Sequence, residues 1–182
     1  MDAIELLLTR QSCPRLAEPG PDKEQLNMIL DAGARVPDHG GLAPWEFVIA
    51  QGDGLARLGQ VFVDAAISNQ ASEVAQKRAL SMPLRAPMVI VVVAKPVEHD
   101  KIPQLEQVIA ASCATMAMQQ AAFASGLGAI WRTGSVAFDP KVNAGLGLTE
   151  HDQIVGFLYI GTPVVNAPIK ASKQGSDFAR YF

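Results

Sequence analysis

Arg10, Gln11 and Ser12 follow an apolar helix that we expect over residues 2–9, and Arg15 stands three positions further on. A phosphate group needs charge-assisted hydrogen-bond donors in a fixed arrangement, and an arginine beside a serine hydroxyl provides them. The alternative is that Arg10 only complements the dipole at the C-terminus of the first helix. The segment is therefore a candidate phosphate site.

Two further groups of residues could contact a ligand. Arg35 and His39 flank a turn between a helix and a strand, and both side chains can donate hydrogen bonds; the alternative for His39 is an ordinary solvated surface position. Trp131, Arg132 and Thr133 follow an Ala-rich helix in a short strand, where the alternative is that Trp131 is core and Arg132 a surface charge. No residue pattern indicates a nucleophile or a general base, so we assign no catalytic side chain.

Other site types lack their signatures. Gly126 and Gly128 follow a helix and lack a third glycine, so they do not form a dinucleotide-binding fingerprint. The three histidines, His39, His99 and His151, have no metal-ligand spacing, so we expect no metal site.

These candidates must be positioned by an alternation of helices and strands. Residues 88–94 form a continuous apolar run typical of a central strand buried on both faces. Asp22 and Gln25 predict an N-terminal capping box, and Asp139 with Pro140 predicts another helix start. The expected helices span residues 2–9, 22–37, 53–68, 73–80, 104–125 and 140–146, and the expected strands span residues 46–51, 88–94, 129–133 and 154–160. This order predicts an α+β fold, a three-layer α/β/α sandwich, in one domain spanning residues 1–182.

Composition limits the partners. Hydrophobic residues make up 49% of the 182 residues and charged residues 18%, against about 25% charged in typical proteins. This apolar excess predicts a large subunit interface, and the apolar residues 178–182 predict a tail that packs on a partner subunit. A net charge of −3 argues against nucleic-acid binding.

Two features indicate a cytoplasmic protein. The cysteines, Cys13 and Cys113, are only two and lie far apart, and the first residues are acidic where a signal peptide is basic. Residues 107–131 carry no charge and are long enough to span a bilayer, but they include Gln119 and Gln120 and are rich in alanine. We therefore expect a buried helix and no membrane partner.

The segments at residues 10–15 and 35–47, the latter ending in Pro44-Trp45-Glu46-Phe47, resemble the two signatures of the FMN-dependent nitroreductase family. Length and a short middle section resemble its minimal bacterial NAD(P)H nitroreductase type. The resemblance implies the family's α+β intertwined homodimer with two FMN sites at the subunit interface. The residues that it assigns to FMN are Arg10, Gln11, Ser12, Trp131, Arg132 and Thr133, with Lys170 or Lys173 as a second phosphate contact, and Arg35 and His39 reaching across from the other subunit.

The resemblance further implies a ping-pong reaction in which NAD(P)H, the co-substrate, gives a hydride to flavin N5 and a small-molecule acceptor then takes it. The acceptor would be a nitroaromatic, a quinone or a related compound. Two alternatives remain open: a flavin enzyme of the same fold with a different reductive reaction, and a non-catalytic module that binds FMN or another phosphorylated ligand.

Overall fold

A five-stranded sheet forms the centre of the molecule in a computed structural model that describes residues 1–165, 167–171 and 173–182. The strand order is β1–β5–β3–β2, and β4 also pairs with β5. The strands are Leu16–Ala17 (β1), Trp45–Gln51 (β2), Met88–Ala94 (β3), Gly128–Arg132 (β4) and Gln153–Pro163 (β5). Every described pairing is antiparallel, which makes the fold α+β, as predicted.

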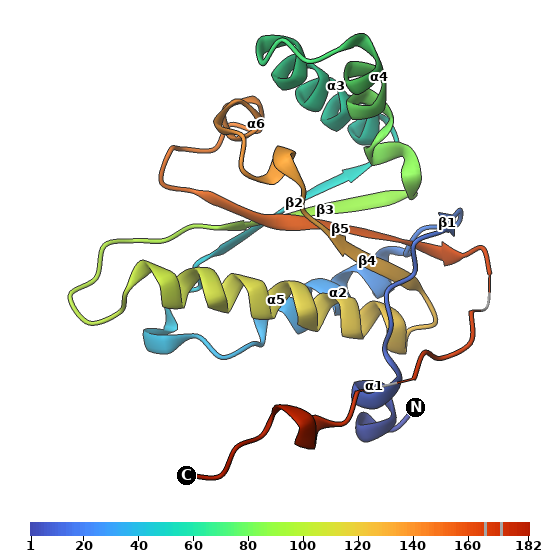
Figure 1. Ribbon diagram of the computed structural model, residues 1–182, viewed down its shortest axis with the longest axis vertical. Helices are drawn as coiled ribbons and strands as arrows, with labels where there is room; N and C mark the ends of the chain where they lie inside the picture. The colour runs from blue at the N-terminus through green and yellow to red at the C-terminus, as the bar shows by residue number, and fades with distance from the viewer. Residues whose placement is uncertain (166, 172) are drawn as a thin grey trace.

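Helices cover both faces of this sheet (Figure 1). The helices on one face are α2 (Lys23–Ala34) and α5 (Gln104–Ala124), and those on the other are α3 (Asp53–Ser68), α4 (Glu73–Ser81) and α6 (Pro140–Gly145). Short 3₁₀ turns connect several elements: η1 (His39–Gly41), η2 (Pro83–Arg85) and η3 (Ser135–Ala137). A fourth, η4 (Gly175–Phe178), lies in the C-terminal tail. The predicted three-layer arrangement is therefore confirmed.

Strand β3 explains why the layers hold together. All seven of its residues are buried. Val89, Val91 and Val93 pack into the cluster under α3, whereas Ile90 and Val92 pack into the cluster under α5. Because side chains alternate between the faces of a strand and both faces are covered here, every position must be apolar.

The helix boundaries follow the caps that the sequence predicts. The carboxylate of Asp22 accepts the Gln25 N–H and the Gln25 side chain accepts the Asp22 N–H, which completes the capping box at the start of α2. Asp139 caps α6 at Lys141. Gly126 has φ 80°, the left-handed conformation that ends α5. The two-residue strand β1 was not predicted, because it is too short to show a periodicity.

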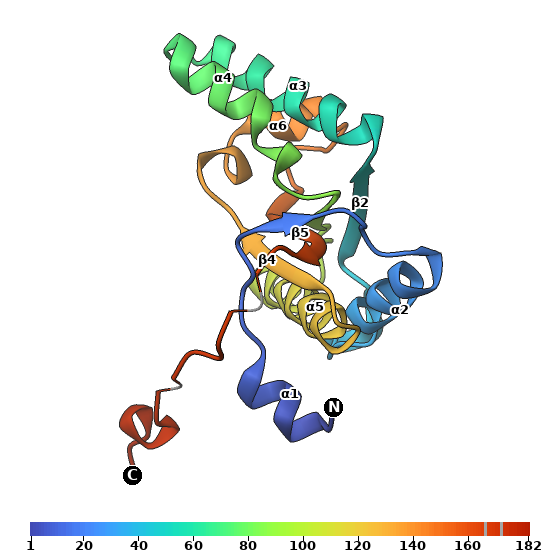
Figure 2. The same cartoon turned by 90° about the vertical axis from the view of Figure 1, so that its right-hand side faces the viewer.

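The two termini lie outside the layers. Helix α1 (Ala3–Thr9) has no buried residue, and its Ile4, Leu7 and Leu8 are exposed. Phe178 and the last two residues are exposed as well. Figure 2 shows α1 and the C-terminal segment extending away from the sheet on the same side. Among the described helices, none combines the length and apolar character that crossing a membrane requires.

Candidate functional site

The first candidate segment, residues 10–15, runs beside the edge of the sheet. The backbone N–H of Cys13 donates to the carbonyl oxygen of Ala129 in β4 at 2.9 Å, and the N–H of Val164 donates to the carbonyl oxygen of Arg15 at 3.1 Å. Backbone hydrogen bonds therefore fix the segment against β4 and against the chain that leaves β5.

Gln11 ties the C-terminal tail to this segment. Its side-chain amide donates to the carbonyl oxygens of Ala167 at 3.2 Å and Pro168 at 3.3 Å, and its oxygen accepts the backbone N–H of Lys170 at 3.2 Å. The Nζ of Lys173 instead lies 5.7 Å from the centre of the Phe178 ring. Of the two candidate lysines, the described tail therefore places Lys170 directly beside the first segment.

Ser12 is supported from behind by a buried glutamine. Gln119 in α5 is 3% exposed, and its amide donates to the carbonyl oxygen of Ala129 at 3.2 Å and to Ser12 Oγ at 3.4 Å. The Ser12 hydroxyl remains on the exposed side. The sequence did not identify Gln119 as a site residue. A glutamine within an uncharged Ala-rich helix is nevertheless a signal, because a buried polar side chain needs a hydrogen-bond partner.

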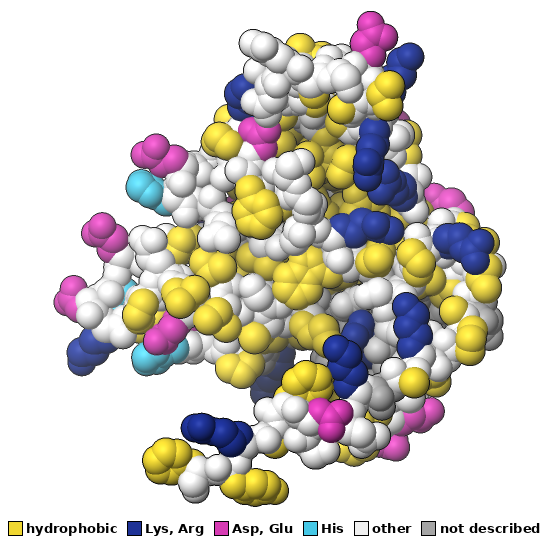
Figure 3. Space-filling view, in the orientation of Figure 1, with side chains coloured by type: hydrophobic (Ala, Val, Ile, Leu, Met, Phe, Trp, Pro, Cys, Tyr) yellow, Lys and Arg dark blue, Asp and Glu magenta, His cyan; other side chains and the backbone are white. Residues whose placement is uncertain are grey.

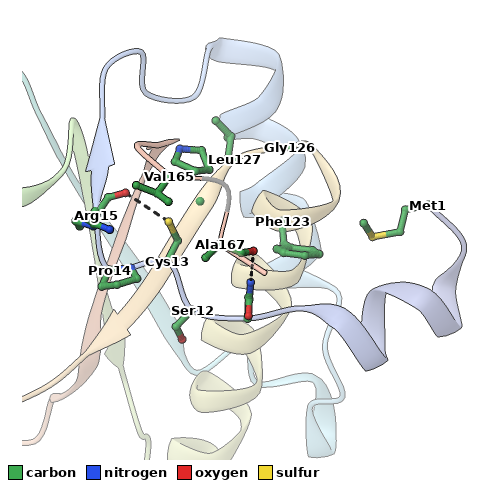
Figure 4. A pocket seen from close by; sticks show the side chains of 13 residues that line it. Met1, Ser12, Cys13, Pro14, Arg15, Phe123, Gly126, Leu127, Val165 and Ala167 are labelled. Atoms are coloured by element: carbon green, nitrogen blue, oxygen red, sulfur yellow. Dashed lines mark hydrogen bonds between the residues drawn. The ribbon is translucent and has the colours of Figure 1, made fainter. Parts of the chain in front are cut away.

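A cavity of about 290 Å³ opens between the first segment, the end of α5 and the tail (Figure 4). Its lining is mostly apolar and includes Cys13, Phe123, Leu127 and Val165, with Gln11, Ser12 and Arg15 as polar contributors. Ligand pockets usually measure about 300–1,000 Å³. The chain by itself thus provides a pocket just below that range.

Trp131 and Arg132 in β4 point to opposite faces of the sheet. Trp131 packs on the α5 side, and its indole N–H donates to the carbonyl oxygen of Val155 at 3.3 Å. Gly156 allows this position, because a Cβ there would lie 2.6 Å from Trp131 Cδ1 and 2.9 Å from the Arg132 carbonyl oxygen. The ring is therefore held by the neighbouring strand.

Arg132 lies on the other face, over Tyr159. Its guanidinium carbon is 5.7 Å from the centre of the Tyr159 ring. Burial raises the pKa of Tyr159, and the positive charges of Arg85 and Arg132 partly offset this effect. The Nε of Arg132 is the one buried side-chain nitrogen or oxygen found without a hydrogen-bond partner in the described residues. An unsatisfied buried donor calls for an acceptor, and the exposed Thr133 follows it directly.

The second candidate segment, residues 35–47, contacts the N-terminal end of α5. Arg35 is exposed at the C-terminus of α2, and His39 opens the η1 turn. The Nδ1 of His39 is 2.8 Å from Oε2 of Glu106, in the first turn of α5. The Asp38 carboxylate accepts the backbone N–H of Ala43 at 2.6 Å. Side-chain contacts therefore anchor this loop.

The two candidate segments do not meet within one chain. Helix α5 contacts the second segment through Glu106 and the first segment through Gln119, and these two positions are 13 residues apart in the helix. At 1.5 Å per residue this is about 20 Å. Figure 1 shows η1 near one end of α5 and the chain leaving α1 near the other. Arg35 and His39 therefore lie far from Arg10 and Ser12 of the same chain.

The sequence is similar to known proteins over most of its length. A family model described as the nitroreductase family matches residues 7–162. The chain is 46% identical over 183 residues to the Escherichia coli strain K12 protein named "Putative NAD(P)H nitroreductase YdjA", covering all of both chains. It is 36% identical over 168 residues to a Haemophilus influenzae protein named "Putative NAD(P)H nitroreductase", covering 92% of this chain and 91% of the relative.

Solved structures share the fold at lower identity. A nitroreductase-like family protein from Bacillus cereus superposes with a TM-score of 0.83 at 23% identity, covering 100% of this chain and 96% of that one. A nitroreductase with bound FMN from Bacteroides fragilis superposes with a TM-score of 0.77 at 21% identity, covering 100% of both chains. These similarities extend over the whole sheet and its helices.

Proposed function

The chain belongs to the nitroreductase family, and on this basis we propose that it is a cytoplasmic FMN-dependent oxidoreductase. It uses NAD(P)H to reduce nitroaromatic, quinone or related small acceptors, and residues 1–182 act as one domain. The observation that carries the proposal is the backbone contact between Cys13 and Ala129, which places the candidate phosphate segment beside the candidate ring segment in β4.

The residues present fit FMN at both of its ends. Arg10 and the exposed Ser12 hydroxyl can bind the phosphate, and Lys170 lies next to them because Gln11 holds the tail there. From Ala129 to Arg132 the strand rises by about 10 Å, which leads from the phosphate end towards the ring end of an extended mononucleotide.

At the ring end, the chain offers a flat support and donors. Trp131 is fixed by Val155 and can pack along the isoalloxazine, and the exposed Thr133 can donate to its polar edge. The Arg132 guanidinium points to the other face of the sheet, over Tyr159, so the proposed contribution of Arg132 is its backbone between these two residues. When bound, FMN accepts a hydride from NAD(P)H at N5 and passes it to the acceptor. Donors held in place beforehand favour the reduced, more negative flavin.

The proposed assembly is an intertwined homodimer with two FMN sites at the subunit interface. Within one chain, about 20 Å of α5 separates the Arg35–His39 loop from the phosphate segment, so this loop contributes to the site of the partner subunit. The exposed apolar residues Ile4, Leu8 and Phe178 on the termini provide surface for such an interface.

Replacement of Arg10 by alanine tests the phosphate end. A hydrogen bond to a charged group contributes about 1.5–3 kcal/mol, so Arg10→Ala should weaken FMN binding about 10- to 100-fold in a fluorescence titration of the flavin-free protein. Arg57→Ala, an exposed arginine on the helix α3 of the other layer, is the matched control and should bind FMN as the unchanged protein does. Equal affinity in all three proteins would contradict the proposed phosphate site.

The visible spectrum tests the reaction itself. Purified protein carrying FMN should be yellow and should bleach when NADH or NADPH is added without oxygen, and its colour should return on addition of a quinone or a nitroaromatic compound. Bound FMN that no nicotinamide reduces would instead identify a non-catalytic binding module. Bleaching without any response to these acceptors would identify a flavin enzyme with a different reductive reaction.

A further inference from the structure

The contact between His39 and Glu106 joins two ionisable side chains that are largely exposed. The two atoms, His39 Nδ1 and Glu106 Oε2, are 2.8 Å apart, and the side chains are 63% and 49% exposed. Exposed ion pairs usually contribute little to stability. The pair is therefore a candidate for a role in chemistry at the site to which the loop contributes.

The loop around His39 has a defined conformation. Gly40 and Gly41 have φ values of 79° and 67°, in the left-handed region that glycine adopts without strain. A side chain at Gly40 would collide with Ile102, and Asp38 fixes the other side of the turn through the Ala43 N–H. Because the backbone is fixed on both sides, the imidazole leaves the turn in a set direction towards Glu106.

The carboxylate also determines which ring nitrogen is free. A carboxylate only accepts hydrogen bonds, so the Nδ1 of His39 must carry a proton in this contact. The other nitrogen, Nε2, is then the one left to contact another group. The other two histidines differ: His99 Nδ1 accepts the Lys101 N–H at 3.2 Å, and His151 lies 3.9 Å from the carboxylate of Glu150.

We propose that His39 donates a proton to the electron acceptor in the FMN site of the partner subunit, and that Glu106 is a positioning residue that keeps Nδ1 protonated and Nε2 facing that acceptor. This inference rests on the proposed FMN-dependent function and on the proposed dimer. It adds a side chain with a chemical role to a site for which the sequence indicated none.

The proton balance of acceptor reduction defines the role of His39. A quinone takes up two electrons with a hydride from the reduced flavin, which forms an O–H bond at one oxygen and leaves the other oxygen negatively charged. The Nε2–H bond of the imidazolium then breaks as the second O–H bond forms, which completes the hydroquinone. The neutral imidazole regains its proton from water. A positioned acid typically accelerates such a transfer by about 10²-fold or more.

Rapid mixing of the reduced holoenzyme with two kinds of acceptor tests the proposal. Menadione, a quinone, needs a proton, whereas ferricyanide takes electrons only. His39→Gln should slow reoxidation by menadione about 10²-fold more than it slows reoxidation by ferricyanide. His99→Gln, which changes another exposed histidine near the start of α5, is the matched control and should react with both acceptors at the original rates.

Variants of Glu106 test the positioning role. Glu106→Ala should slow menadione reduction by about tenfold, less than the loss of the acid itself. Glu106→Gln should recover part of this rate, because its amide oxygen still accepts the Nδ1 proton, and Glu98→Gln should have no effect. Nitrogen NMR of the labelled protein should show the neutral His39 ring with its proton on Nδ1 before the Glu106→Ala change and largely on Nε2 after it.

Three results would overturn the inference. His39→Gln with unchanged menadione kinetics would show that no proton comes from this ring. Equal slowing with both acceptors, together with lost FMN, would mean that His39 only holds the flavin. A proton on Nε2 in the unchanged protein would remove the role of Glu106. If the unchanged protein reduces neither acceptor, the proposed function fails, and this inference fails with it.

Discussion

The two halves of the candidate site are held in different ways. The β4 half-site, made of residues 10–12 and 131–133, is attached to the sheet by the backbone hydrogen bond from Cys13 to Ala129 and by the hydrogen bond from the Trp131 indole to Val155 in β5. The α5 half-site, made of Arg35, His39 and Glu106, is held by side-chain contacts on an exposed turn.

This difference separates what the fold requires from what the chemistry requires. A change in the β4 half-site disturbs strand pairing, so it should alter stability and FMN binding together. A change in the α5 half-site affects exposed side chains, so it should alter the reaction with little effect on folding. The proposed site thus combines a cofactor platform held by strand pairing with a turn whose side chains can change independently.

The largest effect should come from loss of the proposed subunit interface. In the proposed dimer, this interface brings the β4 half-site of one chain to the α5 half-site of its partner. Deletion of residues 178–182 removes two phenylalanines and a tyrosine that are exposed in the single chain. Burial of each such ring contributes about 1.5–3 kcal/mol, so the dimer should dissociate at least about 10³-fold more readily, as measured by analytical ultracentrifugation. Val74→Ser, which changes an exposed valine on α4, should leave the dimer intact; an intact dimer in the deletion variant would refute the role of the tail.

A smaller effect should appear when the β4 half-site alone is disturbed. Gly156→Ala places a methyl group against the Trp131 ring and the Arg132 carbonyl oxygen, and overpacking of this kind costs about 1–3 kcal/mol. Thermal unfolding should shift to lower temperature and FMN affinity should fall in parallel. Gly175→Ala meets no atom within 4 Å and should change neither property. Lower stability with full FMN affinity would show that Trp131 is not part of the cofactor platform.

The smallest effect should appear when the loop of the α5 half-site loses the hydrogen bond between the Asp38 carboxylate and the Ala43 backbone N–H. Asp38→Ala removes the acceptor of the Ala43 N–H, an exposed hydrogen bond that contributes about 1 kcal/mol. The Ala43 amide should exchange its hydrogen faster, while the melting temperature changes by only a few degrees and FMN content is retained. Asp31→Ala, on the exposed side of α2, is the control. A large loss of FMN in Asp38→Ala would mean that the two half-sites do not differ as described.

Much of the fold was predictable because its signals are local. The continuous apolar run of β3, the capping pair Asp22 and Gln25 and the glycine at position 126 each specify an element through neighbouring residues, and the structure confirms all three. The two-residue strand β1 was missed, because only the chain leaving β5 creates it by pairing Leu16 with Pro163.

The candidate site was predictable only in part. Sequence patterns selected Arg10, Ser12 and His39, but they gave no indication that Gln119 lies behind Ser12 or that Glu106 lies beside His39. Each of these pairs joins residues that are more than 60 positions apart in the chain. Their contact depends on the path of α5 across the sheet.

The sequence by itself therefore determined the element types, the buried central strand and the family, and it selected the candidate binding residues. The elements follow from periodicity and caps, and the family follows from the resemblance of two short segments, so all of these are properties of short stretches of chain. Only the tertiary structure decided that Gln11 binds the tail, that Arg132 retains an unsatisfied donor and that the two half-sites lie at opposite ends of α5. Those outcomes depend on packing between distant segments, because a hydrogen-bond partner is chosen by position in space and not by neighbourhood in sequence.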